Sequence, residues 1–133
     1  MGKNQLHRPD IVYPELSYQI IGVTFDVFNE LGYGQKEISY QKAMAIGFSK
    51  AGLKFQEQVY YPVAYRDRQV GKNYFDFLVE GKVIVEIKKG DRFAKSHIDQ
   101  LYRYLVTADL RLGLLVYFAP KNVHFKRIVN IPH

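Results

Sequence analysis

The chain of 133 residues contains no cysteine, which excludes disulfide bonds, thiolate metal sites and a cysteine nucleophile. It has no apolar run long enough to cross a bilayer, and its first residues lack the apolar core of a secretory signal. We therefore expect a soluble cytoplasmic protein that does not contact a membrane. Histidines are few and scattered, without metal-ligand spacing, so we expect surface positions for them and no zinc site: His7, His97, His124 and His133.

Apolar and aromatic residues are plentiful, since 47% of the chain is hydrophobic and it contains eleven tyrosines and nine phenylalanines. A chain of this length forms one domain with a core of useful size. The formal net charge of +6 favours a polyanionic partner such as nucleic acid. Many small soluble proteins carry a similar charge for solubility alone, so charge does not decide between these interpretations.

Hydrophobic periodicity predicts helices over residues 14–31, 36–50 and 95–107, and strands over 55–65, 70–79, 82–87, 112–118 and 123–128. Pro62 indicates that its strand lies at an edge or carries a bulge. The first three strands follow one another as an antiparallel meander. These elements predict an α/β (α+β) fold, with a mixed central sheet of about five strands flanked by helices. Residues 1–12 are polar and interrupted by proline, so we expect a flexible arm.

The strongest functional signal is the hairpin over residues 74–88, where charged residues interrupt two apolar runs. Glu86 and Lys88 are two apart and project from one face of a strand, whereas Val85 and Ile87 point the other way. A carboxylate and an ammonium among apolar side chains are costly to desolvate unless they are paired or hold a metal. The pattern therefore indicates either a partly buried ion-pair network or a metal site.

The register of this hairpin decides whether Asp76 joins Glu86 and Lys88. A two-residue turn at Glu80 and Gly81 would place Asp76 opposite position 85, on the wrong face. An odd loop or a bulge would pair Asp76 with Glu86 and bring both carboxylates together. Three-residue hairpin loops commonly place glycine at the left-handed position, and Gly81 suits that role. We predict the odd register.

The sequence resembles the motif of the PD-(D/E)XK nuclease superfamily, in which an aspartate is followed after about ten residues by Glu-x-Lys. Here these residues are Asp76, Glu86 and Lys88. Residues 34–40 (GQKEISY) fit the pattern of the GxxExxY family, a small-protein branch of that superfamily. Residues 100–104 (QLYRY) match the Q-x-x-x-Y helix element of its exonuclease-type branch. The resemblance runs from about Ile11 to Val129. It departs in one place, since Phe75 stands where the proline of the motif's name would be.

The resemblance implies a restriction-endonuclease-like core over residues 13–133 and a divalent-metal-dependent nuclease that hydrolyses phosphodiester bonds. The metal would be Mg²⁺ or Mn²⁺, which prefer hard oxygen ligands. It would be held by Asp76, Glu86 and the backbone carbonyl of Ile87, with Glu37 as a further acidic group. Lys88 and Gln100 would complete the catalytic set. Position alone also explains Glu37, because a helix dipole favours a carboxylate in the first turn.

Substrate contacts are expected from the cationic loop after Lys88 and from two helices. Beside an acidic metal site, loop cations could hold substrate phosphates, although charge runs are usually only solvated. Gln100 and Tyr104 are four apart and share a helix face, from which they would position substrate or water. The expected substrate-binding residues are Tyr40, Lys89, Arg92, Lys95, Gln100 and Tyr104. Tyr40 also suits a core position in which its hydroxyl bonds a neighbour.

The expected partner is nucleic acid, with DNA favoured over RNA, and a homodimer is one way for so small a chain to gain surface. A catalytically inactive module that keeps the nuclease fold is the main alternative. Its partner would be nucleic acid or a protein, the latter paired through the edge strand near Pro62. The intact Asp76, Glu86 and Lys88 argue against loss of catalysis.

Overall fold

The computed structural model describes residues 12–90 and 92–131. Its helices and strands are α2 (Pro14–Leu31), α3 (Glu37–Lys50), β1 (Phe55–Tyr65), β2 (Arg68–Val79), β3 (Val83–Lys89), α4 (Lys95–Ala108), β4 (Leu112–Phe118) and β5 (Val123–Val129). Each predicted element is confirmed, with boundaries within two residues of those expected. None of the described helices is both long and apolar enough to cross a membrane.

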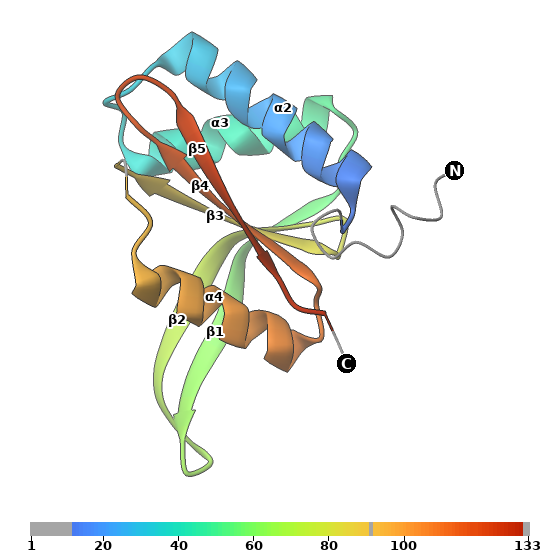
Figure 1. The fold of residues 1–133 in the computed structure, drawn as a ribbon, viewed down its shortest axis with the longest axis vertical. Helices are drawn as coiled ribbons and strands as arrows, with labels where there is room; N and C mark the ends of the chain where they lie inside the picture. The colour runs from blue at the N-terminus through green and yellow to red at the C-terminus, as the bar shows by residue number, and fades with distance from the viewer. Residues whose placement is uncertain (1–11, 91, 132–133) are drawn as a thin grey trace.

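The five strands form one mixed sheet in the order β1-β2-β3-β4-β5. Strands β3 and β4 are parallel, with α4 as the connection between them, and every other neighbouring pair is antiparallel. Helices α2 and α3 cover one face of the sheet, and α4 covers the other (Figure 1). The predicted α+β fold and the β1-β2-β3 meander are therefore confirmed.

The face under α2 and α3 is filled by large apolar side chains. Tyr40, Met44 and Phe48 project from α3 and are fully buried. The ring of Tyr40 stacks on Phe118 of β4, with centroids 4.0 Å apart and planes 2° from parallel. An aromatic pair of this kind contributes about 0.5–1.5 kcal/mol beyond the burial of its two rings. This face supplies most of the core.

The face under α4 has a smaller core, made of Leu101 and Leu105 from the helix and Ile84, Leu115 and Ile128 from the sheet. Helix α4 approaches the sheet closely at Gly113, where an added Cβ would lie 2.7 Å from a methyl carbon of Leu101. A single helix cannot cover all five strands, so α4 packs on only part of this face of the sheet.

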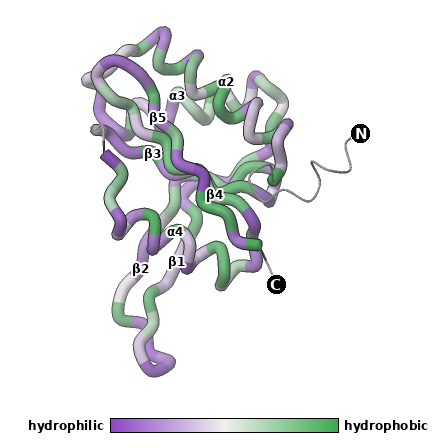
Figure 2. Tube along the Cα trace, in the orientation of Figure 1, coloured by the Kyte–Doolittle hydropathy of each residue, from purple (hydrophilic) through white to green (hydrophobic). Residues whose placement is uncertain are grey.

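The β1–β2 hairpin changes face part-way along its length. Phe77 belongs to the core under α3, whereas Phe75, two residues earlier on the same strand, belongs to the core under α4. The described ladder between the two strands is interrupted at Gln58 and Asp76, and Gln58 has a positive φ of 54°. Beyond this twist the hairpin projects away from the sheet, and its tip is hydrophilic (Figures 1 and 2).

Val12 is the only residue of the predicted arm that the structure describes. Its side chain packs against the core under α2, and its carbonyl oxygen accepts a hydrogen bond from Arg127 Nη2 at 2.9 Å. The folded domain therefore begins no later than Val12. The division into an arm and a single domain otherwise stays a prediction.

Candidate active site

The β2–β3 hairpin has the odd register that the sequence predicted. Phe77 faces Val85, Leu78 faces Ile84 and Val79 faces Val83, which places Asp76 next to Glu86 beyond the last pair. Three residues, 80–82, form the loop. Glu80 and Gly81 have positive φ values of 54° and 65°, and the Lys82 N–H donates to the Val79 carbonyl at 3.0 Å. This loop geometry fixes the register and so brings the two carboxylates to one place.

Asp76 and Glu86 are held by reciprocal hydrogen bonds between side chain and backbone. The Asp76 N–H donates to Glu86 Oε1 at 3.0 Å, and the Ile87 N–H donates to Asp76 Oδ2 at 2.7 Å. These contacts continue the β2–β3 pairing where the described ladder has ended. Because each carboxylate accepts from a rigid strand, both side chains are fixed in direction before any ligand binds.

Lys88 completes a cluster of three charges. Its Nζ lies 3.6 Å from Glu86 Oε2, and the two side chains are 26% and 14% exposed. Glu86 and Lys88 face α4, since their partners on β4, Leu115 and Tyr117, belong to the core on that side. The alternating residues of β3 are buried under α3. One strand therefore supplies core to one face and charge to the other.

Burial raises the pKa of the Glu86 carboxyl to about 8, and the negative charge of Asp76 adds to this effect while Lys88 opposes it. Burial also raises the pKa of Asp76, against the hydrogen bond from Ile87 that favours its ionised form. Two neighbouring buried carboxylates are costly to ionise together without a compensating cation. Lys88 compensates only part of this charge, so the pair suits a bound divalent ion.

The donor set fits a hard cation better than a zinc-type site. Within the described ranges, no group of three or more histidine, cysteine, aspartate or glutamate side chains lies close enough to hold a metal ion. Mg²⁺ commonly uses only one or two protein carboxylates and fills its shell with water and phosphate oxygens. Asp76 and Glu86 are two neighbouring carboxylates of this kind. The carbonyl of Ile87 points toward the same strand edge as its N–H, which contacts Asp76.

The family model of the PD-(D/E)XK nuclease superfamily matches residues 14–128, which span both acidic residues and Lys88. The chain belongs to this superfamily. No curated protein sequence matches it. Among solved structures, it is similar to the protein SSO0001, with a TM-score of 0.47 and 16% sequence identity. The similarity covers 83% of this chain and 62% of SSO0001, so the chain spans less than two thirds of that protein.

Membership of the PD-(D/E)XK superfamily confirms the coarser of the two predicted assignments and suggests nuclease activity. The five-stranded mixed sheet with three flanking helices is the restriction-endonuclease-like core that the sequence predicted. The assignment to the GxxExxY branch stays a prediction.

Glu37 begins α3 and is exposed. Burial is the largest cause of the raised pKa of Asp76, and the negative charge of Glu37 is a smaller one. The same charge acts to raise the pKa of His97, against burial and Lys88. Glu37 therefore lies near enough to the PD-(D/E)XK cluster for its charge to act on Asp76. The starts of α3 and α4 and the end of β3 lie on the same side of the molecule (Figure 1).

Tyr40 requires a correction, because we expected it to contact substrate. The side chain is fully buried, and its hydroxyl donates to the Gly32 carbonyl and accepts from the Gln35 N–H. Each hydrogen-bonding function of the hydroxyl thus has a partner in the loop before α3. Tyr40 instead stabilises the loop from Gly32 to Gln35, which leads into α3 and its first residue, Glu37.

Gln100 and Tyr104 lie on the side of α4 that faces the β1–β2 hairpin. The Tyr104 ring contacts Phe75 and Tyr61, with centroid distances of 4.9 and 5.2 Å. Burial raises the pKa of the Tyr104 hydroxyl. Gln100 lines a cavity between α4 and the hairpin. The two residues share a helix face, as the sequence predicted, but Tyr104 is mainly part of an aromatic cluster.

The cations of the loop differ in their surroundings. Lys95 forms an ion pair with Asp99, with Nζ 2.6 Å from Oδ2, so part of its charge is compensated. Lys89 is exposed, with its Nζ 5.9 Å from the ring centroid of Tyr33. Arg92 is exposed. Lys89 ends β3, Arg92 follows in the loop and Lys95 begins α4, and these places are compatible with contact to phosphates beside the cluster.

His97 is the residue that sequence reasoning missed, because we expected it at the surface. It is half-buried, and its Nδ1 lies 3.0 Å from the hydroxyl of Tyr117, the β4 partner of Lys88. Burial and the charge of Lys88 lower the pKa of His97. Its position three residues before Gln100 is the signal that could have found it. His124 is exposed as expected, and His7 and His133 lie outside the described residues.

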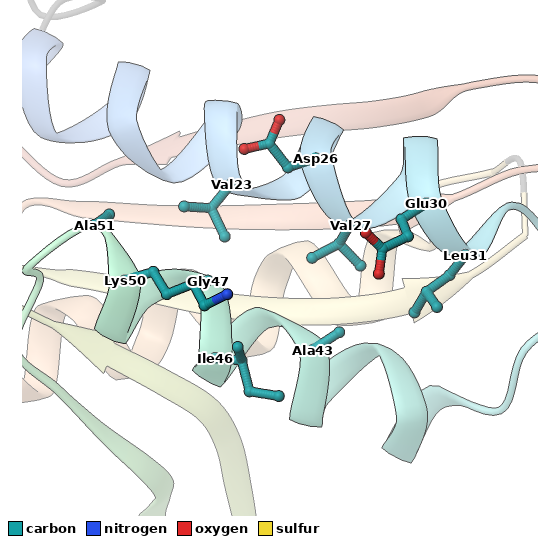
Figure 3. A pocket seen from close by; sticks show the side chains of 10 residues that line it. All are labelled: Val23, Asp26, Val27, Glu30, Leu31, Ala43, Ile46, Gly47, Lys50 and Ala51. Atoms are coloured by element: carbon teal, nitrogen blue, oxygen red, sulfur yellow. The ribbon is translucent and has the colours of Figure 1, made fainter.

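A second cavity, of about 440 Å³, lies between α2 and α3 (Figure 3). Val23, Val27 and Ile46 line it, with the carboxylates of Asp26 and Glu30 at its edge. Both helices lie on the opposite face of the sheet from Glu86 and Lys88. None of the residues that line this cavity belongs to the predicted site.

Proposed function

We propose that the chain is a divalent-metal-dependent nuclease that hydrolyses phosphodiester bonds, with DNA favoured over RNA. The observation that carries this proposal is the reciprocal pair of hydrogen bonds that fixes Asp76 and Glu86 beside Lys88. Superfamily membership supports it, and so does the net charge of +6. The pattern of Gly34, Glu37 and Tyr40 supports placement in the GxxExxY branch. A cytoplasmic location and a homodimer remain expectations.

Asp76, Glu86 and the carbonyl of Ile87 would hold Mg²⁺ or Mn²⁺, with Glu37 at the start of α3 as a further acidic group. When bound, such an ion lowers the pKa of a coordinated water and neutralises charge on the phosphate. The two carboxylates are already aligned by backbone N–H donors, so little reorganisation is needed on binding. Rigid ligands of this kind favour one binding geometry over others.

Lys88 is placed to orient the attacking water and to stabilise the negative charge that develops on the phosphate. Its ammonium group is near Glu86 and partly exposed, so it can reach both the carboxylate and an incoming substrate. Gln100 would position substrate or water from α4. Lys89, Arg92 and Lys95 would contact flanking phosphates from the end of β3, the loop after it and the start of α4.

The direct test incubates purified protein with labelled single- and double-stranded DNA and RNA, in Mg²⁺, Mn²⁺ or EDTA. We expect metal-dependent cleavage that EDTA abolishes and that Lys88→Ala strongly reduces. A matched control is Lys50→Ala, which removes an exposed lysine from α3 on the opposite side of the sheet. Cleavage by Lys88→Ala at the wild-type rate would indicate a contaminant and contradict the proposal.

A further inference from the structure

The β1–β2 hairpin extends well beyond the sheet. Strand β2 pairs with β3 only over residues 77–79, whereas it pairs with β1 over residues 68–79. Beyond Asp76 the hairpin is therefore a two-stranded ribbon without a third strand (Figure 1). Such ribbons are marginally stable alone in water. Contacts with α4 are therefore expected to stabilise this ribbon.

The base of the ribbon contacts α4 through the aromatic cluster of Tyr61, Phe75 and Tyr104. Next to this cluster, ribbon and helix enclose a cavity of about 440 Å³. Tyr61 and Asn73 are partners across the two strands and line it from the ribbon side. The helix contributes His97, Gln100 and Arg103.

The polar groups of this cavity are available to a ligand. Within the described residues, the side-chain amides of Asn73 and Gln100 have no hydrogen-bond partner, and the guanidinium of Arg103 has no ion pair. An amide offers both donors and an acceptor, and a guanidinium offers a planar fork that matches a phosphate. The lining thus combines an aromatic ring, two unpaired amides and a free cation.

One residue of the cavity lining, His97, links the cavity to the part of the sheet that carries the charged cluster. His97 lines the cavity and also bonds Tyr117, the strand partner of Lys88. The charge of Lys88 adds to burial in lowering the pKa of His97, which is a sign that the two groups are near each other. A ligand in the cavity would therefore contact His97, which lies between the cavity and Lys88.

We infer that this cavity binds a single strand of nucleic acid, at the nucleotides adjacent to the bond held by Asp76, Glu86 and Lys88. The inference rests on the proposed function and names its substrate class. Cavities of roughly 300–1,000 Å³ accommodate one small ligand, on the scale of a nucleotide. The volume of about 440 Å³ is on this scale, so the cavity accommodates unpaired nucleotides and not both strands of a duplex.

Each lining group has a role in such binding. Aromatic side chains such as Tyr61 provide a surface on which an unpaired base can stack, whatever its identity. Arg103 pairs with a backbone phosphate, and Asn73 and Gln100 bond base edges or sugar. The stacking and phosphate contacts do not depend on base identity, so they select strandedness over sequence.

Fluorescence anisotropy in EDTA tests this inference separately from catalysis. The probe is a labelled oligothymidylate of about 16 nucleotides, the upper end of common single-strand site sizes, compared with a duplex of equal length. We expect the single strand to bind more tightly than the duplex. Arg103→Gln should weaken single-strand binding about tenfold and reduce the slope of log affinity against log salt by about 0.7.

Two controls sharpen the result. Arg103→Lys keeps the charge and should retain most of the affinity, whereas Lys50→Gln removes one charge from α3 and should leave affinity unchanged. Equal binding by wild type and Arg103→Gln, or tighter binding of the duplex, would overturn the inference. Because no metal is present, the outcome does not depend on cleavage. Strand binding without metal-dependent cleavage would contradict the proposed function alone.

Discussion

The two faces of the sheet differ in what they contribute. Under α2 and α3, large apolar side chains fill the space and stabilise the fold. Under α4, a smaller core leaves room for the acidic cluster and the cavity beside the ribbon. Strand β3 serves both faces, with Val85 and Ile87 on one side and Glu86 and Lys88 on the other. Because side chains alternate along β3, core residues lie on one face and charged residues on the other. Substitutions under α2 and α3 should therefore change stability, whereas substitutions of the charged residues should change activity.

Phe48→Ala should have the largest effect on stability, because this ring is fully buried between Phe55 and Phe77. Loss of a buried phenylalanine costs about 3–5 kcal/mol. Denaturant unfolding in EDTA measures it, with Tyr102→Ala as the control because Tyr102 is 45% exposed on α4. Equal stability of the two variants would contradict the assignment of the main core to the α3 face.

Asp76→Asn should act in the opposite way, by removing activity without loss of stability. We expect cleavage to fall about 10²–10³-fold, as when one group that stabilises the transition state is lost. The melting temperature in EDTA should stay the same or rise, because a carboxyl whose pKa is raised by burial is removed. The control is Asp26→Asn on the exposed side of α2, which should keep full activity. Loss of activity in both variants would contradict the assignment of catalysis to the face under α4.

Gly47→Ala tests how closely α2 and α3 approach. An added Cβ would lie 2.5 Å from Val23 Cγ1, so we expect a loss of about 1–3 kcal/mol from overpacking. Gly22→Ala on α2 meets nothing within 4 Å and should stabilise the helix by roughly 1 kcal/mol. Thermal unfolding compares the pair. The account of this face is wrong if Gly47→Ala is as stable as Gly22→Ala.

The dependence of stability on pH should come from the other face and be smaller. The pKa of Glu86 is raised from 4.5 to about 8 by burial, so the folded state binds this proton more tightly than the unfolded state does. Its contribution is therefore fully present below pH 4.5 and is lost as pH rises toward about 8. In EDTA, the melting temperature should therefore fall across this window.

Glu86→Gln should flatten that dependence, because its amide does not ionise, whereas Glu30→Gln on α2 should leave it unchanged. A wild-type melting temperature that rises steadily between pH 5 and 8 would show that Glu86 is not a buried acid with a raised pKa. The sign of the slope is thus the informative quantity.

Local sequence signals were enough to predict the elements and the β2–β3 hairpin. Gly81 can adopt the positive φ of a three-residue loop, and the loop then fixes the register that brings Asp76 to Glu86. The alternation of β3 predicted that Glu86 and Lys88 share a face. Each of these features depends on residues that are close in the sequence.

Features that depend on distant contacts were not predictable in this way. His97 bonds Tyr117, 20 residues away, through the crossover that places α4 over β4. Tyr40 was ambiguous because its burial depends on Phe118. The twist at Gln58 has no sequence signal, since glutamine does not favour a positive φ. The cavity between the ribbon and α4 follows from that twist.

Isothermal titration calorimetry with Mn²⁺ tests most directly whether Asp76 and Glu86 together hold a hard cation. The titration is done at a pH above about 8, the pKa of Glu86, so that its carboxyl is ionised. We predict that wild type and Glu30→Gln bind the ion equally well, whereas Glu86→Gln and Asp76→Asn lose most of the binding heat. Undiminished binding in Glu86→Gln and Asp76→Asn would contradict the account.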